Sequence, residues 1–124
     1  MKAWIGKTLV GIGLLHTVFG VVRFGFRQAV LGDMLREGLF NTIRSSVDDP
    51  LRAAAFWFFV VGFALMLIGS VIDRLERLGQ PLPRSTAWGF ACLTVVCLVV
   101  IPRSGFWFII PPAVGMLYRD LGRL

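Results

Sequence analysis

The sequence contains few of the residues from which metal centres and catalytic sites are built. Its 124 residues include one histidine, His16, two cysteines, Cys92 and Cys97, and seven acidic residues. The cysteines are five positions apart, which on a helix separates them by about 140° around the axis and disfavours a bridge between them. One histidine and two dispersed cysteines do not form a ligand cluster. We therefore expect no metal site, and no motif assigns catalytic residues.

Charged residues are also scarce, and this decides the class of protein. They make up 16% of the chain, and hydrophobic residues make up 56%, whereas soluble domains have about 25% charged residues. A single domain of this length cannot bury so much apolar surface in water, and disordered chains are far less hydrophobic. The sequence predicts an integral membrane protein. Its net charge of +6 comes from basic residues that mostly flank apolar runs, which suits lipid headgroups and not nucleic acid.

Four apolar runs predict four membrane-spanning helices. A helix needs about 20 residues to cross the hydrocarbon core of a bilayer. The first two runs meet this length. The last two are short, so they form either two short spans, which we favour, or one re-entrant hairpin. Pro111 and Pro112 are expected to kink the last helix. The predicted fold is an all-α, four-helix membrane bundle in a single transmembrane domain (residues 1–124), with spans at about 3–22, 53–72, 86–101 and 106–118.

The segment between the first two spans has a different pattern. Residues 28–45 carry apolar side chains at nearly helical spacing together with several charges. An amphipathic helix of this kind lies at the membrane interface and does not cross the bilayer. With four spans, the thirteen basic residues divide seven to six between the two sides, with seven on the side of the termini. The positive-inside rule then places both termini in the cytoplasm.

Small residues recur at seven-residue spacing on the first two spans. In membranes, small residues let helix backbones approach closely and pack. These two stripes are therefore expected to meet or to line a shared cleft. The predicted helix-packing residues are Gly6, Gly13 and Gly20 in the first span and Ala55, Gly62 and Gly69 in the second.

His16 shares the glycine face of the first span and is the leading candidate for a ligand-binding residue. Ionisable residues inside a membrane are costly and often functional. His16 can transfer a proton, hold a ligand such as a haem, a quinone or a lipid, or simply make a hydrogen bond between helices. Arg23 follows seven residues later on the same face. It lies near the membrane surface, where it can anchor the helix or bind an anionic headgroup.

Three further polar residues complete the candidate ligand site. Glu37 and Asn41 are four residues apart on one face of the interfacial helix, and Arg103 lies in the turn between the last two runs. Glu37 can pair with Arg23, Arg36 or Arg103, or it can act with His16 as a general base and acid. A solvated polar face is the simpler interpretation of Glu37 and Asn41.

Four segments, in this order, resemble a known family. They are Gly13-Leu14-Leu15-His16-Thr17, Glu37-Gly38-Leu39-Phe40-Asn41, Ala54-Ala55-Phe56-Trp57-Phe58 and Pro102-Arg103-Ser104-Gly105-Phe106-Trp107. Together they resemble an uncharacterised family of small bacterial four-span membrane proteins, a domain of unknown function, and are distantly similar to the DoxX-like membrane proteins. The resemblance implies four helices and a bacterial inner-membrane location. It brings no established activity, so no catalytic residue can be assigned from it.

Three functions remain open. The first is a non-enzymatic accessory or structural subunit that packs in a larger membrane complex or with copies of itself. The second is a binder of a lipid-like molecule, such as a quinone, a lipid or a haem, in an intramembrane cleft near His16. The third is a small membrane isomerase or redox enzyme that uses His16 and Glu37. We expect the lipid bilayer as a partner and no nucleic acid, and the sequence identifies no cofactor.

Overall fold

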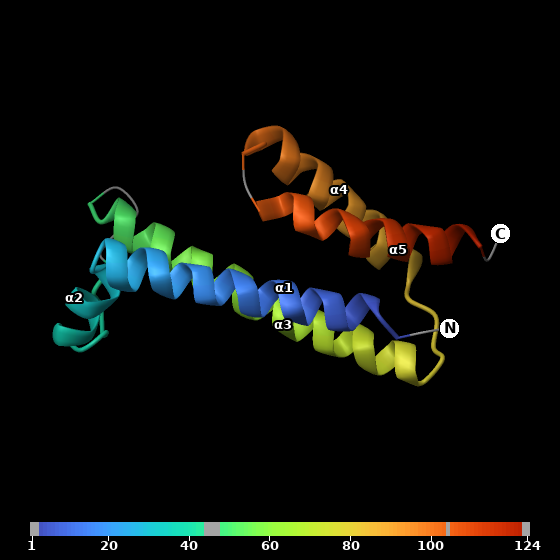
Figure 1. Ribbon diagram of the computed structural model, residues 1–124, viewed down its shortest axis with the longest axis horizontal. Helices are drawn as coiled ribbons and strands as arrows, with labels where there is room; N and C mark the ends of the chain where they lie inside the picture. Colours follow the sequence, from blue (N-terminus) through green and yellow to red (C-terminus); the bar gives the residue numbers. More distant parts are fainter. Residues whose placement is uncertain (1–2, 44–47, 104, 123–124) are drawn as a thin grey trace. The chain divides into compact units, whose positions relative to one another are not determined.

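The computed structural model describes residues 3–43, 48–103 and 105–122 (Figure 1). These residues form helices, turns and loops without a β-strand, so the predicted all-α class is confirmed. Residues 44 and 45 of the expected interfacial helix, and Ser104, lie outside the described ranges. In chain order the elements are α1 (Ile5–Gly20), the π-helix η1 (Val21–Arg27), α2 (Val30–Arg36), α3 (Pro50–Arg77), α4 (Arg84–Val100), the 3₁₀-helix η2 (Gly105–Ile109) and α5 (Ile110–Leu121).

Among the residues that the structure describes, two helical stretches are long and apolar enough to cross a membrane. They are Ile5–Arg27, in which η1 continues α1, and Pro50–Arg77, which is α3. Both are longer than the apolar runs that predicted them, because arginine is a good helix former and the helix does not stop where the apolar run ends. α4 is apolar but has only 17 residues.

The structure consists of two compact units, and each contains part of α1 and part of α3. The first unit comprises residues 1–12 and 67–124. Within it, α4 and α5 lie side by side and antiparallel (Figure 1). Its buried apolar side chains come from all of its helices and include Ile5, Leu9, Ile72, Ala87, Ile109 and Met116.

The second unit comprises residues 13–66 and holds the rest of α1 and α3 together with η1 and α2. α2 packs beside η1. Their contact places Phe24, Val30 and Met34 in one buried cluster with Ala55 of α3. Phe58 and Phe59 of α3 pack against this cluster. The segment after α1 is therefore folded back onto α3 by apolar contacts.

The amphipathic helix predicted over residues 28–45 is shorter in the structure, and α2 covers only Val30–Arg36. After α2, the φ angles of Gly38, Leu39 and Asn41 are 86°, 65° and 52°. Residues with a left-handed backbone cannot continue a right-handed helix. The apolar spacing extends past this point, but the backbone does not follow it. The local signal for the stop is Gly38, since glycine commonly ends helices.

The two prolines of the last apolar run begin a helix and do not interrupt one. α5 starts at Ile110, so Pro111 and Pro112 lie in its first turn. The N–H groups of a first turn have no partner within the helix, and a proline there loses no hydrogen bond. The expected kink in a continuous helix is thus wrong: the run 106–118 divides between η2 and α5.

Candidate functional site

Within the first unit, α1 and α3 are in contact through backbone at glycines. A Cβ atom added at Gly69 would lie 2.8 Å from the carbonyl oxygen of Gly6 and 2.8 Å from the amide nitrogen of Val10. A Cβ at Gly6 would collide with the backbone of Asp73 and Gly69. Only glycine allows the two helices to lie this close.

The same packing continues in the second unit. A Cβ at Gly13 would lie 2.8 Å from the carbonyl oxygen of Gly62. A Cβ at Gly20 would lie 2.8 Å from the ring of Phe58. All six residues of the two predicted stripes are buried. The stripes therefore meet within each unit, and at these positions they leave no cleft between α1 and α3.

His16 is part of this helix contact. Its Nε2 donates a hydrogen bond to the carbonyl oxygen of Phe58 at 2.9 Å. Its ring stacks on the ring of Phe58, with 3.8 Å between the ring centroids and 12° between the planes. Gly62 makes room for it, because a Cβ there would lie 3.2 Å from the His16 ring. Of the roles predicted for His16, the structure shows the hydrogen bond between helices.

The other residues of the predicted ligand site have different partners. The Arg23 guanidinium lies over the ring of Phe24, 5.6 Å from its centroid. Glu37 forms an ion pair with Arg52 of α3. Asn41 is exposed. No described hydrogen bond or ion pair joins Arg23 or Asn41 to His16, and the exposed Arg103 belongs to the first unit.

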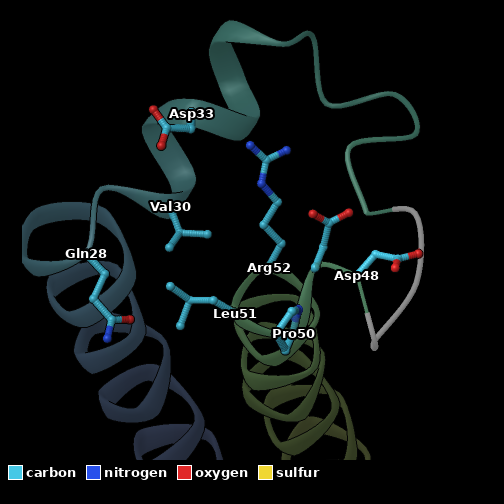
Figure 2. A pocket seen from close by; sticks show the side chains of 8 residues that line it. Gln28, Val30, Asp33, Asp48, Pro50, Leu51 and Arg52 are labelled. Atoms are coloured by element: carbon cyan, nitrogen blue, oxygen red, sulfur yellow. The ribbon is translucent and has the colours of Figure 1, made fainter.

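A pocket of about 290 Å³ lies between Gln28 (the residue after η1), α2 and the start of α3 (Figure 2). Val30 and Leu51 supply apolar wall, and Asp33 and Asp48 supply carboxylates. Figure 2 shows Arg52 reaching from the first turn of α3 toward α2. Its guanidinium forms an ion pair with Glu37 and donates a hydrogen bond to the carbonyl oxygen of Thr42 at 2.9 Å. Arg52 therefore joins α3 to the segment after α2, and it is not free to hold a ligand in this pocket.

A second polar cluster, in the first unit, is centred on Glu76. Its carboxylate accepts hydrogen bonds from three backbone N–H groups at the start of α1: Gly6 at 2.7 Å, Trp4 at 3.2 Å and Ile5 at 3.3 Å. It also forms an ion pair with Arg119 of α5. The side chain is only 2% exposed. Glu76 thus caps α1 from a distant helix and satisfies donors that would otherwise be buried without partners.

Asp120 extends this cluster between α4 and α5. Trp88 donates its indole N–H to Oδ2 of Asp120 at 3.2 Å. The Arg84 Nε lies 3.3 Å from Oδ1, close enough for an ion pair, although Oδ1 accepts no hydrogen bond of good geometry. The carboxylate is buried. Charged contacts therefore join the start of α1 to α3 and α5, and the start of α4 to the end of α5.

Sequence reasoning missed this cluster, yet two signals pointed to it. The residues before Ile5 are Ala3 and Trp4, and neither has a side chain that can cap a helix. A carboxylate, Glu76, stands just beyond the second apolar run, at the end of α3 that an antiparallel pair places beside the start of α1. An uncapped helix start opposite such a carboxylate predicts a tertiary cap.

The sequence matches a family described as a family of unknown function (DUF6463) over residues 1–123. The chain belongs to this family. The expectation of an uncharacterised family is therefore confirmed, whereas the distant similarity to DoxX-like proteins and the bacterial origin stay predictions. No curated protein and no solved structure matches the chain. Membership in DUF6463 assigns no activity.

Proposed function

We propose that this member of DUF6463 is a multi-pass protein of the bacterial inner membrane and serves as a non-enzymatic subunit of a membrane complex. The observation that carries the membrane assignment is the exposure of apolar side chains along its longest helices. Only 22% of the apolar window in Ile5–Arg27 and 28% of that in Pro50–Arg77 is buried. A core helix of a soluble protein has most of its surface covered, and exposed apolar patches mark lipid or protein contacts.

The exposed apolar side chains continue onto the shorter helices. Leu15 in α1 is 60% exposed and Val99 in α4 is 75% exposed. α4 has 17 residues, and η2 with α5 spans residues 105–121. A helix of about 17 residues is at the lower limit for crossing a bilayer. These lengths support four spans over a re-entrant hairpin, and the slight excess of basic residues supports cytoplasmic termini.

A structural role is the function that the side-chain geometry favours. His16 and Glu37, the acid and base of the enzymatic alternative, are each used in contacts between segments of the chain. The binding alternative needs a cleft beside His16, and glycine contacts fill that place between α1 and α3. The exposed apolar faces of α1, α3 and α4 are available to lipid, to another membrane protein or to a second copy.

The test is to isolate the full-length protein from its own membrane in a mild detergent and to measure the mass of the particle. We expect a particle larger than protein plus detergent, containing a stoichiometric partner or further copies, and no visible absorption band. The variant His16→Phe should keep this assembly. A lone chain that carries a quinone or haem, and loses it in His16→Phe with the fold retained, would instead establish the binding function.

A further inference from the structure

We propose that η1 binds the anionic phospholipid headgroups of the bilayer that holds the chain, through Arg23 and Arg27. The inference rests on the proposed membrane insertion and adds a lipid preference to it. The two arginines are four residues apart on the π-helix, about one turn, and both are exposed. Arginine suits this role because its planar guanidinium matches a phosphate with paired N–H donors.

Charge pairing within the second unit singles out these two arginines. Arg36 forms an ion pair with Asp33 at 2.6 Å, and Arg52 forms one with Glu37. In the part of the chain that the structure describes, Arg23 and Arg27 have no carboxylate partner. The Arg23 guanidinium lies over the face of Phe24, and this contact leaves the N–H donors along its edge for another acceptor. Two adjacent positive charges are therefore left for a ligand of opposite sign.

The carboxylates near this end of the unit are largely committed to the chain itself. Asp33 and Glu37 are neutralised by Arg36 and Arg52. Asp48 and Asp49, which line the pocket at the start of α3, also have interaction partners. Among the described residues, no ion pair joins these carboxylates to Arg23 or Arg27, and so no contact described there cancels the positive charge of η1.

The position of η1 along the helix places the arginines at the membrane surface. α1 begins at Ile5, and a helix rising 1.5 Å per residue crosses about 30 Å of hydrocarbon in roughly 20 residues. The boundary then falls close to Arg23, and Arg27 lies one turn beyond it. At this depth, a guanidinium can reach phosphate without entering the hydrocarbon.

Exposed apolar side chains accompany the arginines. Phe26, between Arg23 and Arg27 in sequence, is 81% exposed, and Val22 one turn before it is also exposed. An aromatic ring and a valine facing out beside two arginines form the mixed surface that interfacial segments present to lipid. In water the Phe26 ring would have no apolar surface to contact.

The experiment measures the preference of the purified full chain for phosphatidylglycerol over phosphatidylcholine, from lipid-induced shifts in its thermal unfolding midpoint. Near an anionic surface each arginine contributes about fivefold in affinity, so the pair should contribute more than tenfold. Arg23→Gln/Arg27→Gln should lose most of this preference, and Arg23→Lys/Arg27→Lys should keep part of it. Arg36→Gln/Arg77→Gln removes the same charge from two other exposed arginines, which are already paired with Asp33 and Asp73, and should retain the preference.

The inference is overturned if the wild type and Arg23→Gln/Arg27→Gln show the same lipid preference. It is also overturned if the Arg36→Gln/Arg77→Gln control loses as much of the preference as Arg23→Gln/Arg27→Gln does. Circular dichroism shows that each variant has folded. Resistance of the wild type to alkaline extraction from membranes is measured in parallel. If the wild type is extracted by alkali, the proposed membrane function has failed. If it resists extraction but shows no lipid preference, only the headgroup inference has failed.

Discussion

Glu76 holds the backbone N–H of Gly6, 70 residues away, at 2.7 Å. This one contact joins the beginning of α1 to the end of α3 with a buried charge. The first N–H groups of a helix carry a partial positive charge, and a carboxylate placed there is stabilised by it. Arg119 neutralises the same carboxylate from α5. The stability of the first unit should therefore depend strongly on Glu76.

Replacing Glu76 by alanine should destabilise the protein more than any change at an exposed ion pair. Glu76→Ala removes the cap and breaks the largely buried ion pair with Arg119, which costs about 3–5 kcal/mol. Glu76→Gln keeps an oxygen for the N–H groups and should cost about 1–3 kcal/mol. Both losses are measured from unfolding in detergent, with circular dichroism as the signal. Asp33→Asn, at an exposed pair, is the control and should cost less than about 1 kcal/mol. A Glu76→Ala protein as stable as this control would disprove the capping role.

Gly69 and Gly11 give a matched test of the helix contact. A Cβ at Gly69 meets backbone atoms of Gly6 and Val10 at 2.8 Å, whereas a Cβ at Gly11 meets nothing within 4 Å. Gly69→Ala should therefore cost about 1–3 kcal/mol, because backbone cannot move aside as a flexible side chain can. Gly11→Ala should be neutral or stabilising by up to about 1 kcal/mol, because alanine is the better helix former. The test compares the free energies of unfolding of the two variants. Similar values would mean that α1 and α3 do not pack as described.

Two substitutions of His16 test whether this histidine has a structural role. His16→Phe keeps a ring for stacking on Phe58 and loses the hydrogen bond to its carbonyl oxygen. Hydrogen bonds between membrane helices contribute about 0.6 kcal/mol on average, so the loss in His16→Phe should be small. His16→Ala also removes the stacked ring and should cost clearly more. Equal stability of the two variants, measured by thermal unfolding in detergent, would show that the stacking contributes nothing.

The sequence was most informative where a pattern is local. Apolar runs located the cores of α1 and α3, and the spacing of Gly6, Gly13 and Gly20 identified the face of α1 that meets α3. These features follow from helical periodicity alone. Helix ends were less predictable, because arginine-containing turns extend α3 to Arg77 while left-handed residues stop α2 at Arg36.

The partners of charged side chains on distant segments were not predicted. Glu76 was not distinguished from other charged residues near a helix end, since nothing local shows that it faces the start of α1. Likewise, Arg52 forms an ion pair with Glu37, the residue that the sequence suggested as a general base. Both misses have one cause: the partner of a charged side chain is set by tertiary packing, and spacing along a single helix does not contain it.

The most direct test of the account is the membrane topology. In a background carrying Cys92→Ala and Cys97→Ala, single cysteines are introduced as Gln28→Cys, Gln80→Cys and Arg103→Cys and labelled with an impermeant maleimide in oriented membrane vesicles. Four spans with cytoplasmic termini predict that Gln28→Cys and Arg103→Cys react from the periplasmic side and Gln80→Cys from the cytoplasmic side. Reaction of Arg103→Cys from the same side as Gln80→Cys, or recovery of the protein as a water-soluble monomer, would contradict the account.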